Sequence, residues 1–274
     1  MVENLRGQYG FFKKLRVWFG GRSVIVLTMG KVGTLTICNS LNRIGFQHVH
    51  PHSLYYTRPG VHFLDIKLSP AQRLWYAYKT LMKRLKVRIW SALSSKIIII
   101  TGARDPFSRA ISAYFEQSHY FGGIPQDWGY DEILEDFEKR AFVDATTTWF
   151  DKEIKRFSGI DVIGSDFPKE LGYKSYRNGK LRLFVYRIDR LNDIGPEIGA
   201  FLGMPEFTVY PANETSGSQN AEKYADFARR YKFDRATGER LAATAYIKTF
   251  YSDAEIAALL ERWVEPGGEQ DARR

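Results

Sequence analysis

The sequence has very little cysteine and no long apolar run, and each shortage excludes a structural class. Cys38 is the only cysteine among 274 residues, so an intramolecular disulfide is impossible. No stretch reaches the roughly 18 apolar residues that a membrane-spanning helix requires, so we expect no membrane span. Internal repeats and low-complexity tracts are also missing. A hydrophobic fraction of 44% and a charged fraction of 26% are ordinary for a globular protein.

Acidic side chains are outnumbered by basic ones, which favours anionic partners. The formal net charge is +9 and the isoelectric point is about 9.4. Nucleotides, sulfated or carboxylated glycans, nucleic acid and membrane surfaces all fit this charge, as does a plain excess of surface lysine. Cys38 lies among apolar residues of a predicted helix, so we expect it to be packed rather than reactive. A single cysteine, and no continuous apolar segment within residues 1–22, lead us to expect a cytoplasmic protein.

Short apolar runs alternate with helical periodicities along the chain, which predicts an α/β fold with a central, mostly parallel sheet flanked by helices. The predicted strands are 23–28, 46–50, 96–101, 173–177 and 180–186, the last two joined by a type I′ turn at Asn178-Gly179. The predicted helices are 34–44, 70–93, 106–117, 130–141, 145–157 and 189–202, with a helical region over 218–264. Gly195-Pro196 should break or restart the helix predicted over 189–202. We expect an N-terminal extension (1–22), one domain (23–265) and a disordered tail (266–274).

The first chemically informative segment follows the apolar run at 24–27 and extends from Thr28 to Thr36. Gly30 and Gly33 allow the backbone to approach a phosphate closely, and Lys31 supplies a mobile positive charge. The segment is not a Walker A loop, because Ile25 stands where the first glycine should be. An ordinary strand–turn–helix connection without a ligand is the alternative.

The second informative segment follows the isoleucine run at 97–100. Arg104 stands at the carboxyl end of that predicted strand, where open α/β sheets bind ligands. Ser112 lies eight residues later, about two helical turns along, with Arg109 between them. We expect both segments to bind phosphate at a helix N-terminus, which suggests a ligand with two separated phosphates. Surface arginines on an ordinary helix are the alternative.

Together these two segments resemble the sulfotransferase family. In that family a strand–loop–helix binds the 5′-phosphosulfate of 3′-phosphoadenosine-5′-phosphosulfate, and a later Arg with a Ser eight residues on binds the 3′-phosphate. The resemblance assigns the donor site to Lys31, Val32, Gly33, Thr34, Leu35, Thr36, Arg104 and Ser112. Leu35 departs from the small hydroxyl residue that is common in the family. The resemblance also implies a P-loop NTPase-like fold and metal-independent transfer.

Residues 148–155 and 159–162 are similar to bacterial sulfotransferase-like proteins labelled as capsular polysaccharide synthesis proteins. Segment 184–191 looks like the later strand-to-helix segment of the same fold. This similarity favours a carbohydrate acceptor. It leaves the acceptor, the sulfated position and the oligomeric state open.

A general base for an acceptor hydroxyl is expected among three histidines at alternate positions. His50 is the first candidate and His48 the second, since both end the second predicted strand near the phosphate loops. With His52 they could instead hold a zinc ion, although Pro51 bends that segment. Glu153, with Asp151 beside it, is the competing candidate base.

The basic, aromatic stretch 72–90 could form an acceptor platform, contact nucleic acid or be an amphipathic helix with a solvated face. Two other functions therefore stay open beside sulfuryl transfer. One is an atypical P-loop kinase that uses ATP and magnesium, and the other is a non-enzymatic polyanion-binding protein.

Overall fold

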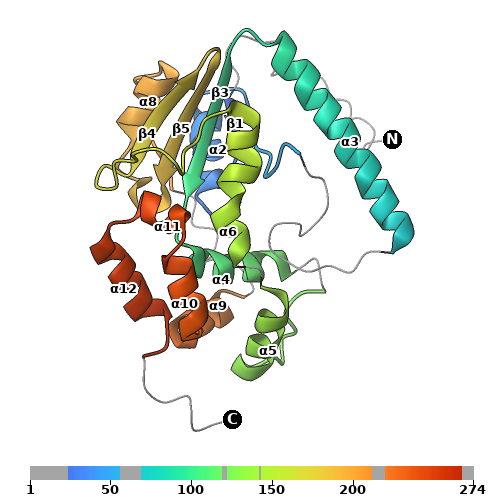
Figure 1. The fold of residues 1–274 in the computed structure, drawn as a ribbon, viewed down its shortest axis with the longest axis vertical. Helices are drawn as coiled ribbons and strands as arrows, with labels where there is room; N and C mark the ends of the chain where they lie inside the picture. Colours follow the sequence, from blue (N-terminus) through green and yellow to red (C-terminus); the bar gives the residue numbers. More distant parts are fainter. Residues whose placement is uncertain (1–23, 56–68, 119–121, 142, 212–219, 267–274) are drawn as a thin grey trace.

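The protein is described from a computed structural model covering residues 24–55, 69–118, 122–141, 143–211 and 220–266 (Figure 1). The predicted N-terminal extension and nearly all of the predicted tail lie outside these ranges. The chain forms an α/β structure, as its alternating pattern predicts.

A five-stranded sheet has the order β2-β1-β3-β5-β4. Its strands are β1 (Val24–Val26), β2 (His48–Val49), β3 (Ile97–Ala103), β4 (Tyr173–Asn178) and β5 (Leu181–Arg187). Four strands are parallel, and β4 pairs antiparallel with β5 at the edge. All seven residues of β3 are buried, as a central strand covered on both faces requires.

Helices cover both faces of this sheet, because successive strand residues point to opposite sides. Val24 and Ile98 pack with α2 (Thr34–Arg43) and α8 (Gly195–Leu202) on one face. Ile25 and Ile99 belong to the larger core on the other face. The other helices are α3 (Pro70–Leu93), α4 (Pro106–Gln117), α5 (Tyr130–Arg140), α6 (Asp144–Trp149), α7 (Arg156–Ser158), α9 (Ala221–Arg230), α10 (Arg235–Ala242), α11 (Ala245–Phe250) and α12 (Asp253–Trp263).

Local signals fixed several helix ends. Ser69 accepts a hydrogen bond from the Gln72 amide and forms a capping box, with Pro70 in the first turn of α3. Gly45 takes a positive φ of 66° just after α2 and ends it. The predicted helices at 34–44, 70–93, 106–117 and 130–141 are confirmed.

Three local predictions were wrong in detail. The helix predicted over 145–157 contains a π-helical segment, η2 (Phe150–Lys155). The helix predicted from residue 189 begins at Gly195, after a short 3₁₀ turn, η3 (Ile188–Arg190).

The hairpin is also shifted by one residue. Asn178 pairs with Leu181, so the turn residues are Gly179 and Lys180, and only Gly179 has a positive φ. A type I′ turn at Asn178-Gly179 is therefore wrong, because that turn needs a positive φ at both central residues. The Asn178 side chain instead donates to the Ser158 carbonyl at 2.8 Å.

Candidate functional site

The loop between β1 and α2 has an unusual backbone. Gly30, Lys31 and Gly33 have φ angles of 82°, 60° and 77°, and Lys31 is the one non-glycine residue with a positive φ in the described ranges. A Cβ on Gly33 would lie 2.4 Å from Leu191 Cδ2, so both conformation and space require glycine there. Such strain in a non-glycine residue is typical of functional sites.

The helix α2 begins at a residue that cannot cap it with a side chain. Gly33 is its N-cap and makes no side-chain capping hydrogen bond, and the first turn holds no acidic residue. The N-cap position therefore does not supply the side-chain acceptor that many helices have. An uncapped helix N-terminus is where proteins bind phosphate and sulfate groups.

The Arg109 side chain of α4 fixes the backbone of the β1–α2 loop. Its guanidinium donates to the carbonyls of Met29 at 2.8 Å and Gly30 at 3.3 Å, and to Thr146 Oγ1 at 2.9 Å. The side chain is only 1% exposed, and burial lowers its pKa to about 9, so it remains charged at neutral pH. Arg109 therefore positions the loop and adds a positive charge next to it.

Other residues of the loop pack into the core or hydrogen-bond to one another. Val32 is buried, and its carbonyl accepts a hydrogen bond from Tyr186 Oη at 2.7 Å, so its side chain belongs to the core. The hydroxyls of Thr28 and Thr34 are hydrogen-bonded to each other at 2.7 Å. Val32 can therefore serve a ligand only through its backbone.

Arg104 reaches the same loop from the end of β3. Its Nη1 donates to the Lys31 carbonyl at 3.1 Å and its Nε to Ser108 Oγ at 3.0 Å. Tyr246 Oη brackets the Arg104 backbone, accepting from its amide and donating to its carbonyl. Arg104 is thus held at the loop by side-chain and backbone contacts together.

The N-terminus of α4 differs from that of α2. The Asp105 carboxylate accepts hydrogen bonds from the Ser108 amide and hydroxyl. The expected phosphate site on the α4 amides is therefore wrong, because a carboxylate of the chain already occupies that position. This segment can offer a ligand only the side chains of Arg104 and Ser112.

A cavity of about 430 Å³ lies where these segments meet. Of the residues predicted from the sequence, it is lined by Lys31, Gly33, Thr34, Leu35, Thr36, His50, Arg104 and Ser112. Val32, His48 and Glu153 are not among its lining residues. The cavity is also lined by Glu116, Asn192 and Tyr224, which the sequence did not single out, and by His52, which the sequence offered only as a zinc ligand.

Glu116 brings negative charge into this cavity. Its carboxylate lies 3.5 Å from the Lys31 ammonium. Glu116 follows Ser112 by four residues on α4, so helical spacing could have placed both on one face. An anionic ligand at Lys31 would compete with this ion pair.

His52 lies directly against the β1–α2 loop. Its Nδ1 is 3.1 Å from the Thr28 carbonyl, and a Cβ on Gly30 would lie 3.6 Å from its Cε1. The carbonyl can only accept, so Nδ1 carries the proton and Nε2 keeps its lone pair. Partial burial lowers the pKa of His52 below its ordinary value, although the Thr28 carbonyl opposes this shift.

Glu153 lies outside the cavity and is fully buried. Its carboxylate accepts hydrogen bonds from Ser53 Oγ at 2.6 Å and from the Leu54 amide at 2.7 Å. Burial raises the pKa of Glu153 despite these two bonds. Both oxygens therefore hold the segment after β2, and the structure does not bring this candidate base to the phosphate loops. Asp151 is exposed and also lies outside the cavity lining.

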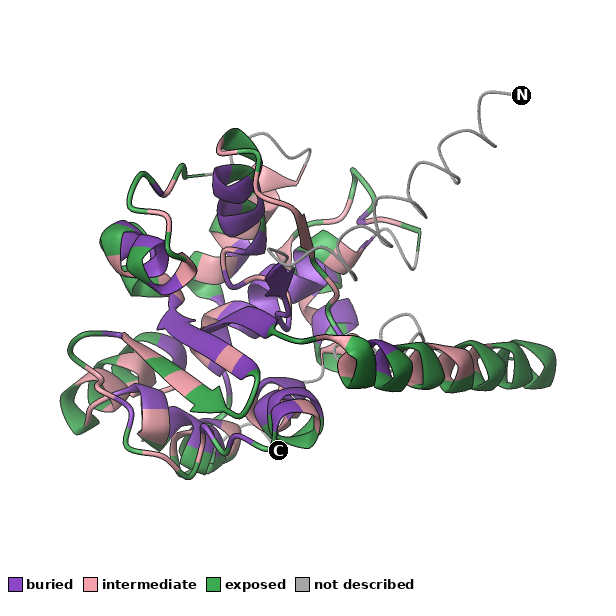
Figure 2. Ribbon diagram, turned by 90° about the horizontal axis from the view of Figure 1, so that it is seen from above, coloured by how far each residue is buried: buried purple, intermediate pink, exposed green. Residues whose placement is uncertain are grey.

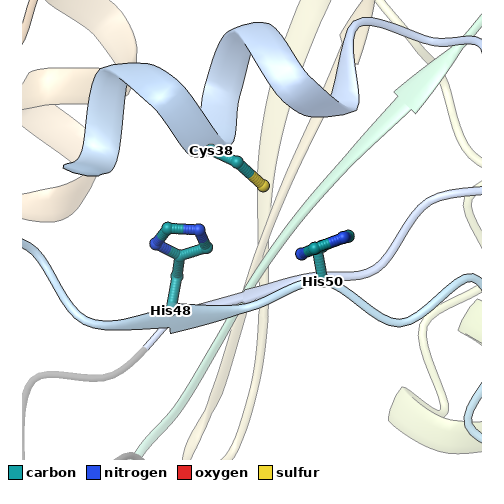
Figure 3. Close-up of side chains that lie close together, drawn as sticks. All are labelled: Cys38, His48 and His50. Carbon is teal, nitrogen blue, oxygen red and sulfur yellow. The ribbon is translucent and has the colours of Figure 1, made fainter. Parts of the chain in front are cut away.

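His48 and His50 lie on the face of β2 and its continuation that packs under α2. Figure 3 shows both rings and the Cys38 thiol of α2 turned toward one another. One ligand atom of each residue lies within 4.8 Å of the others. The predicted base His50 thus lines the cavity and also belongs to a Cys-His-His cluster, whose cysteine no local sequence motif could reveal.

Comparisons of the chain with family models, curated proteins and solved structures found no match. Within the described ranges, no helix combines the length and the apolar composition needed to cross a bilayer. The geometry of the cavity therefore carries the functional argument.

Proposed function

We propose that the protein is a sulfotransferase that moves a sulfuryl group from 3′-phosphoadenosine-5′-phosphosulfate to an acceptor hydroxyl, with a carbohydrate favoured as acceptor. The observation that carries this proposal is the convergence of Lys31 and Arg104, from the ends of two neighbouring strands, on one cavity. The volume of about 430 Å³ is in the usual range for small-molecule sites.

The donor's two anionic ends fit the two kinds of phosphate contact. The uncapped N-terminus of α2, the hydroxyls of Thr34 and Thr36 and the Lys31 ammonium suit the 5′-phosphosulfate. The Arg104 guanidinium and the Ser112 hydroxyl suit the 3′-phosphate. In this assignment Val32 and Leu35 contribute backbone only.

The proposed transfer step needs no metal ion. The acceptor oxygen forms a bond to sulfur while the bond from sulfur to the bridging phosphate oxygen breaks, and the acceptor proton passes to a base. Lys31 stabilises the charge that develops on the bridging oxygen, so catalysis comes from positioning and electrostatics.

His52 is the base that the geometry favours over His50 and His48. Its Nδ1 lies 3.1 Å from the Thr28 carbonyl at the start of the β1–α2 loop, and its Nε2 retains the lone pair that accepts a proton. Its lowered pKa keeps the ring neutral at physiological pH. His50 lines the same cavity and is the second candidate.

Support for a carbohydrate acceptor comes from the sequence resemblance and the net positive charge. Trp149 and Phe150, in the resembling segment 148–155, are buried and so cannot stack on a sugar. An acceptor glycan would therefore have to be held by other side chains.

The test is thermal unfolding with matched nucleotides. A ligand at about one hundred times its dissociation constant stabilises a protein by about 2.7 kcal/mol, or about 5–10 °C for a chain of this size. We expect 3′-phosphoadenosine-5′-phosphate, the product nucleotide, to stabilise the protein far more than 5′-AMP or ATP with magnesium. Arg104→Ala should reduce the advantage over 5′-AMP, whereas Arg235→Ala, an exposed control on α10, should not.

Other outcomes would replace the proposal. Stronger stabilisation by ATP with magnesium would indicate a kinase. No stabilisation by any nucleotide, together with salt-sensitive binding of sulfated or phosphorylated polymers, would indicate a polyanion-binding protein.

A further inference from the structure

Three metal-ligating side chains meet between α2 and β2. His48 and His50 are two residues apart in extended chain, so they share the face that lies under α2, and Cys38 points down toward them (Figure 3). One sulfur or nitrogen atom from each residue lies within 4.8 Å of the others. Cys38 comes from a different element, so the fold and not a local motif assembles the cluster.

We propose that Cys38, His48 and His50 bind a divalent ion of the zinc class. A thiolate and two imidazoles are the ligands that zinc prefers, and a fourth position would stay open to water. Tetrahedral zinc holds its ligand atoms about 3.5 Å apart, and these atoms lie within 4.8 Å of one another, so the cluster has to tighten by about 1 Å at most. His50 is exposed, and rotation of its ring can supply that movement.

A hydrogen bond already orients one ligand. His48 Nδ1 lies 3.3 Å from the Phe46 carbonyl, which can only accept, so Nδ1 carries the proton and Nε2 keeps its lone pair. Metal-bound histidines commonly donate their other ring proton to a carbonyl in this way. Binding converts the Cys38 thiol to a metal-bound thiolate and releases one proton to solvent.

Cobalt provides the test, because its spectrum reports a thiolate ligand directly. We expect the chelator-treated full chain to bind one Co²⁺ with a thiolate-to-cobalt charge-transfer band and intense tetrahedral visible bands, and Zn²⁺ to displace it. Cys38→Ala should abolish the charge-transfer band, and His50→Ala should weaken binding at least tenfold. Asn39→Ala, an exposed neighbour of Cys38 on α2, should leave both unchanged.

His50→Ala keeps the test decisive if Cys38→Ala unfolds, because His50 is exposed. A missing thiolate band, or binding that survives both variants, would overturn the site. Neither readout depends on a sulfuryl donor, so the result is independent of the proposed function.

A second, independent observation concerns the exposed face of α3. Seven of the ten large exposed hydrophobic residues in the described ranges lie on this helix. They are Leu74, Trp75, Tyr78, Leu81, Leu85, Ile89 and Leu93. Six of them recur at intervals of three or four residues, so they form one continuous apolar stripe along the helix.

This stripe faces away from the described part of the protein. On the opposite side, Trp90 stacks on Phe157 at 6.1 Å and Val87 is buried. Figure 2 shows α3 projecting to one side, with its far end almost entirely exposed. The stripe therefore has no partner among the described residues.

The charge of α3 has one sign. Its sequence contains Arg73, Lys79, Lys83, Arg84, Lys86 and Arg88, and no Asp or Glu. Lys79 lies over the Trp75 ring at 4.8 Å, and it flanks the stripe on one side as Arg88 does on the other. An apolar stripe edged by basic residues is the pattern of helices that lie in a membrane interface.

We infer that the stripe of α3 docks onto an anionic lipid surface. A second copy of this chain would place two purely cationic helices side by side, which charge repulsion opposes. Anionic headgroups instead neutralise the flanking cations while the apolar side chains enter the headgroup region. This binding is peripheral and agrees with the finding on membrane-crossing helices above.

Vesicle flotation tests this inference. The full chain should float with phosphatidylcholine vesicles that contain phosphatidylglycerol, bind pure phosphatidylcholine at least tenfold less, and be released by added salt. Leu81→Asp with Leu85→Asp should lower binding at least tenfold, and both positions are exposed, so folding is preserved. Leu171→Asp, at an exposed leucine outside α3, is the control and should bind normally.

Light scattering tests the alternative that a second copy of this chain covers the stripe. A dimer that the double variant disrupts, without vesicle binding by the unaltered chain, would assign the stripe to a second copy and overturn the inference. Equal loss of vesicle binding with Leu171→Asp would overturn it as well.

Discussion

The two helices that follow β1 and β3 begin in opposite ways. The helix α2 starts at Gly33 without a side-chain cap, whereas α4 starts at Asp105, whose carboxylate accepts from the Ser108 amide. Both segments have the same strand–turn–helix pattern in the sequence. A side-chain cap and a bound anion would use the same amides, so the cap on α4 leaves α2 as the N-terminus with room for an anion.

Because of this difference, the β1–α2 and β3–α4 segments can contact a ligand in different ways. The first can bind an anion through backbone amides, with Lys31 as a movable charge. The second is restricted to side chains, with Arg104 fixed by the Lys31 carbonyl and Ser108. The predictions below test the two segments and the residues around them, first by activity and binding and then by stability, each from the largest expected effect to the smallest.

Lys31→Ala should remove most of the transfer activity. Under the proposed function the loss in kcat is about 10³-fold, because the positive charge at the bridging oxygen is lost at the moment it is needed. Release of 3′-phosphoadenosine-5′-phosphate in the presence of a glycan acceptor measures it. Lys152→Ala, at an exposed lysine, is the control, and near-normal activity of Lys31→Ala would contradict the assignment.

His52→Gln should lower transfer by about 10²-fold, as expected for loss of a general base. The pKa of His52 is lowered below its ordinary value of 6.5, and only the neutral ring accepts a proton. In the unaltered protein the rate should therefore rise with pH through a pKa below about 6.5 and be level above it. If His50→Ala removes that acidic limb and His52→Gln does not, His50 is the base.

Arg104→Ala should weaken binding of the bisphosphate nucleotide by about 10- to 100-fold, the usual value of a charge-assisted hydrogen bond. The effect on kcat should be smaller, since the 3′-phosphate is remote from the reacting bond. Titration calorimetry with 3′-phosphoadenosine-5′-phosphate and with 5′-AMP separates the two phosphates. An equal loss for both nucleotides would place Arg104 elsewhere.

Glu153→Ala should lower the free energy of unfolding by about 3 kcal/mol, because it leaves the Leu54 amide and the Ser53 hydroxyl without their acceptor. Glu153→Gln can accept from one and donate to the other, so it should cost about 1 kcal/mol and retain transfer activity. Denaturant unfolding and the transfer assay measure the two effects. Loss of activity in a folded Glu153→Gln protein would restore Glu153 as a candidate base.

The burial of Glu153 also gives a pH dependence. Because its pKa is raised in the folded state, the unfolded chain holds fewer protons at this group, and its contribution to stability falls as pH rises past about 4.5. The Glu153→Gln variant should lack this component.

Asp105→Ala should have the smallest effect and bears most directly on the two helix ends. Loss of the cap should destabilise the protein by about 1 kcal/mol. It should also expose the α4 amides, so we expect inorganic sulfate to protect the variant against thermal unfolding more than it protects the unaltered chain. Equal protection of both would mean that the cap does not control anion access.

Much of the fold could be predicted because its signals are local. The isoleucines at 97–100 predict a buried central strand, and Ser69-Pro70 sets the start of α3. The turn near Gly179 was misplaced because β4–β5 pairing, not the Asn-Gly pair, sets the register. Gly195-Pro196 begins α8, which is one of the two outcomes predicted for that pair, whereas the helix predicted before it is only the short turn η3.

In the candidate site, too, residues chosen for their local pattern could be predicted, and contacts between distant segments could not. Lys31, Gly33, Arg104 and Ser112 could be selected from the sequence, because phosphate chemistry needs those residue types at the ends of strands. The sequence could not reveal that Glu153 is buried against Ser53, that Arg109 supports the loop or that Cys38 joins two histidines. Each of these contacts joins residues from separate elements, about a hundred positions apart for Glu153.

By itself, the sequence determined the order of strands and helices, the glycines of the β1–α2 loop and the one-sided charge of α3. These follow from periodicity, capping and composition, which act over a few neighbouring residues. Only the tertiary structure decided which helix N-terminus stays uncapped, which histidine touches the loop and which face of α3 stays exposed. Those outcomes depend on packing between distant segments, where burial and hydrogen-bond satisfaction select one arrangement among many that the local pattern allows.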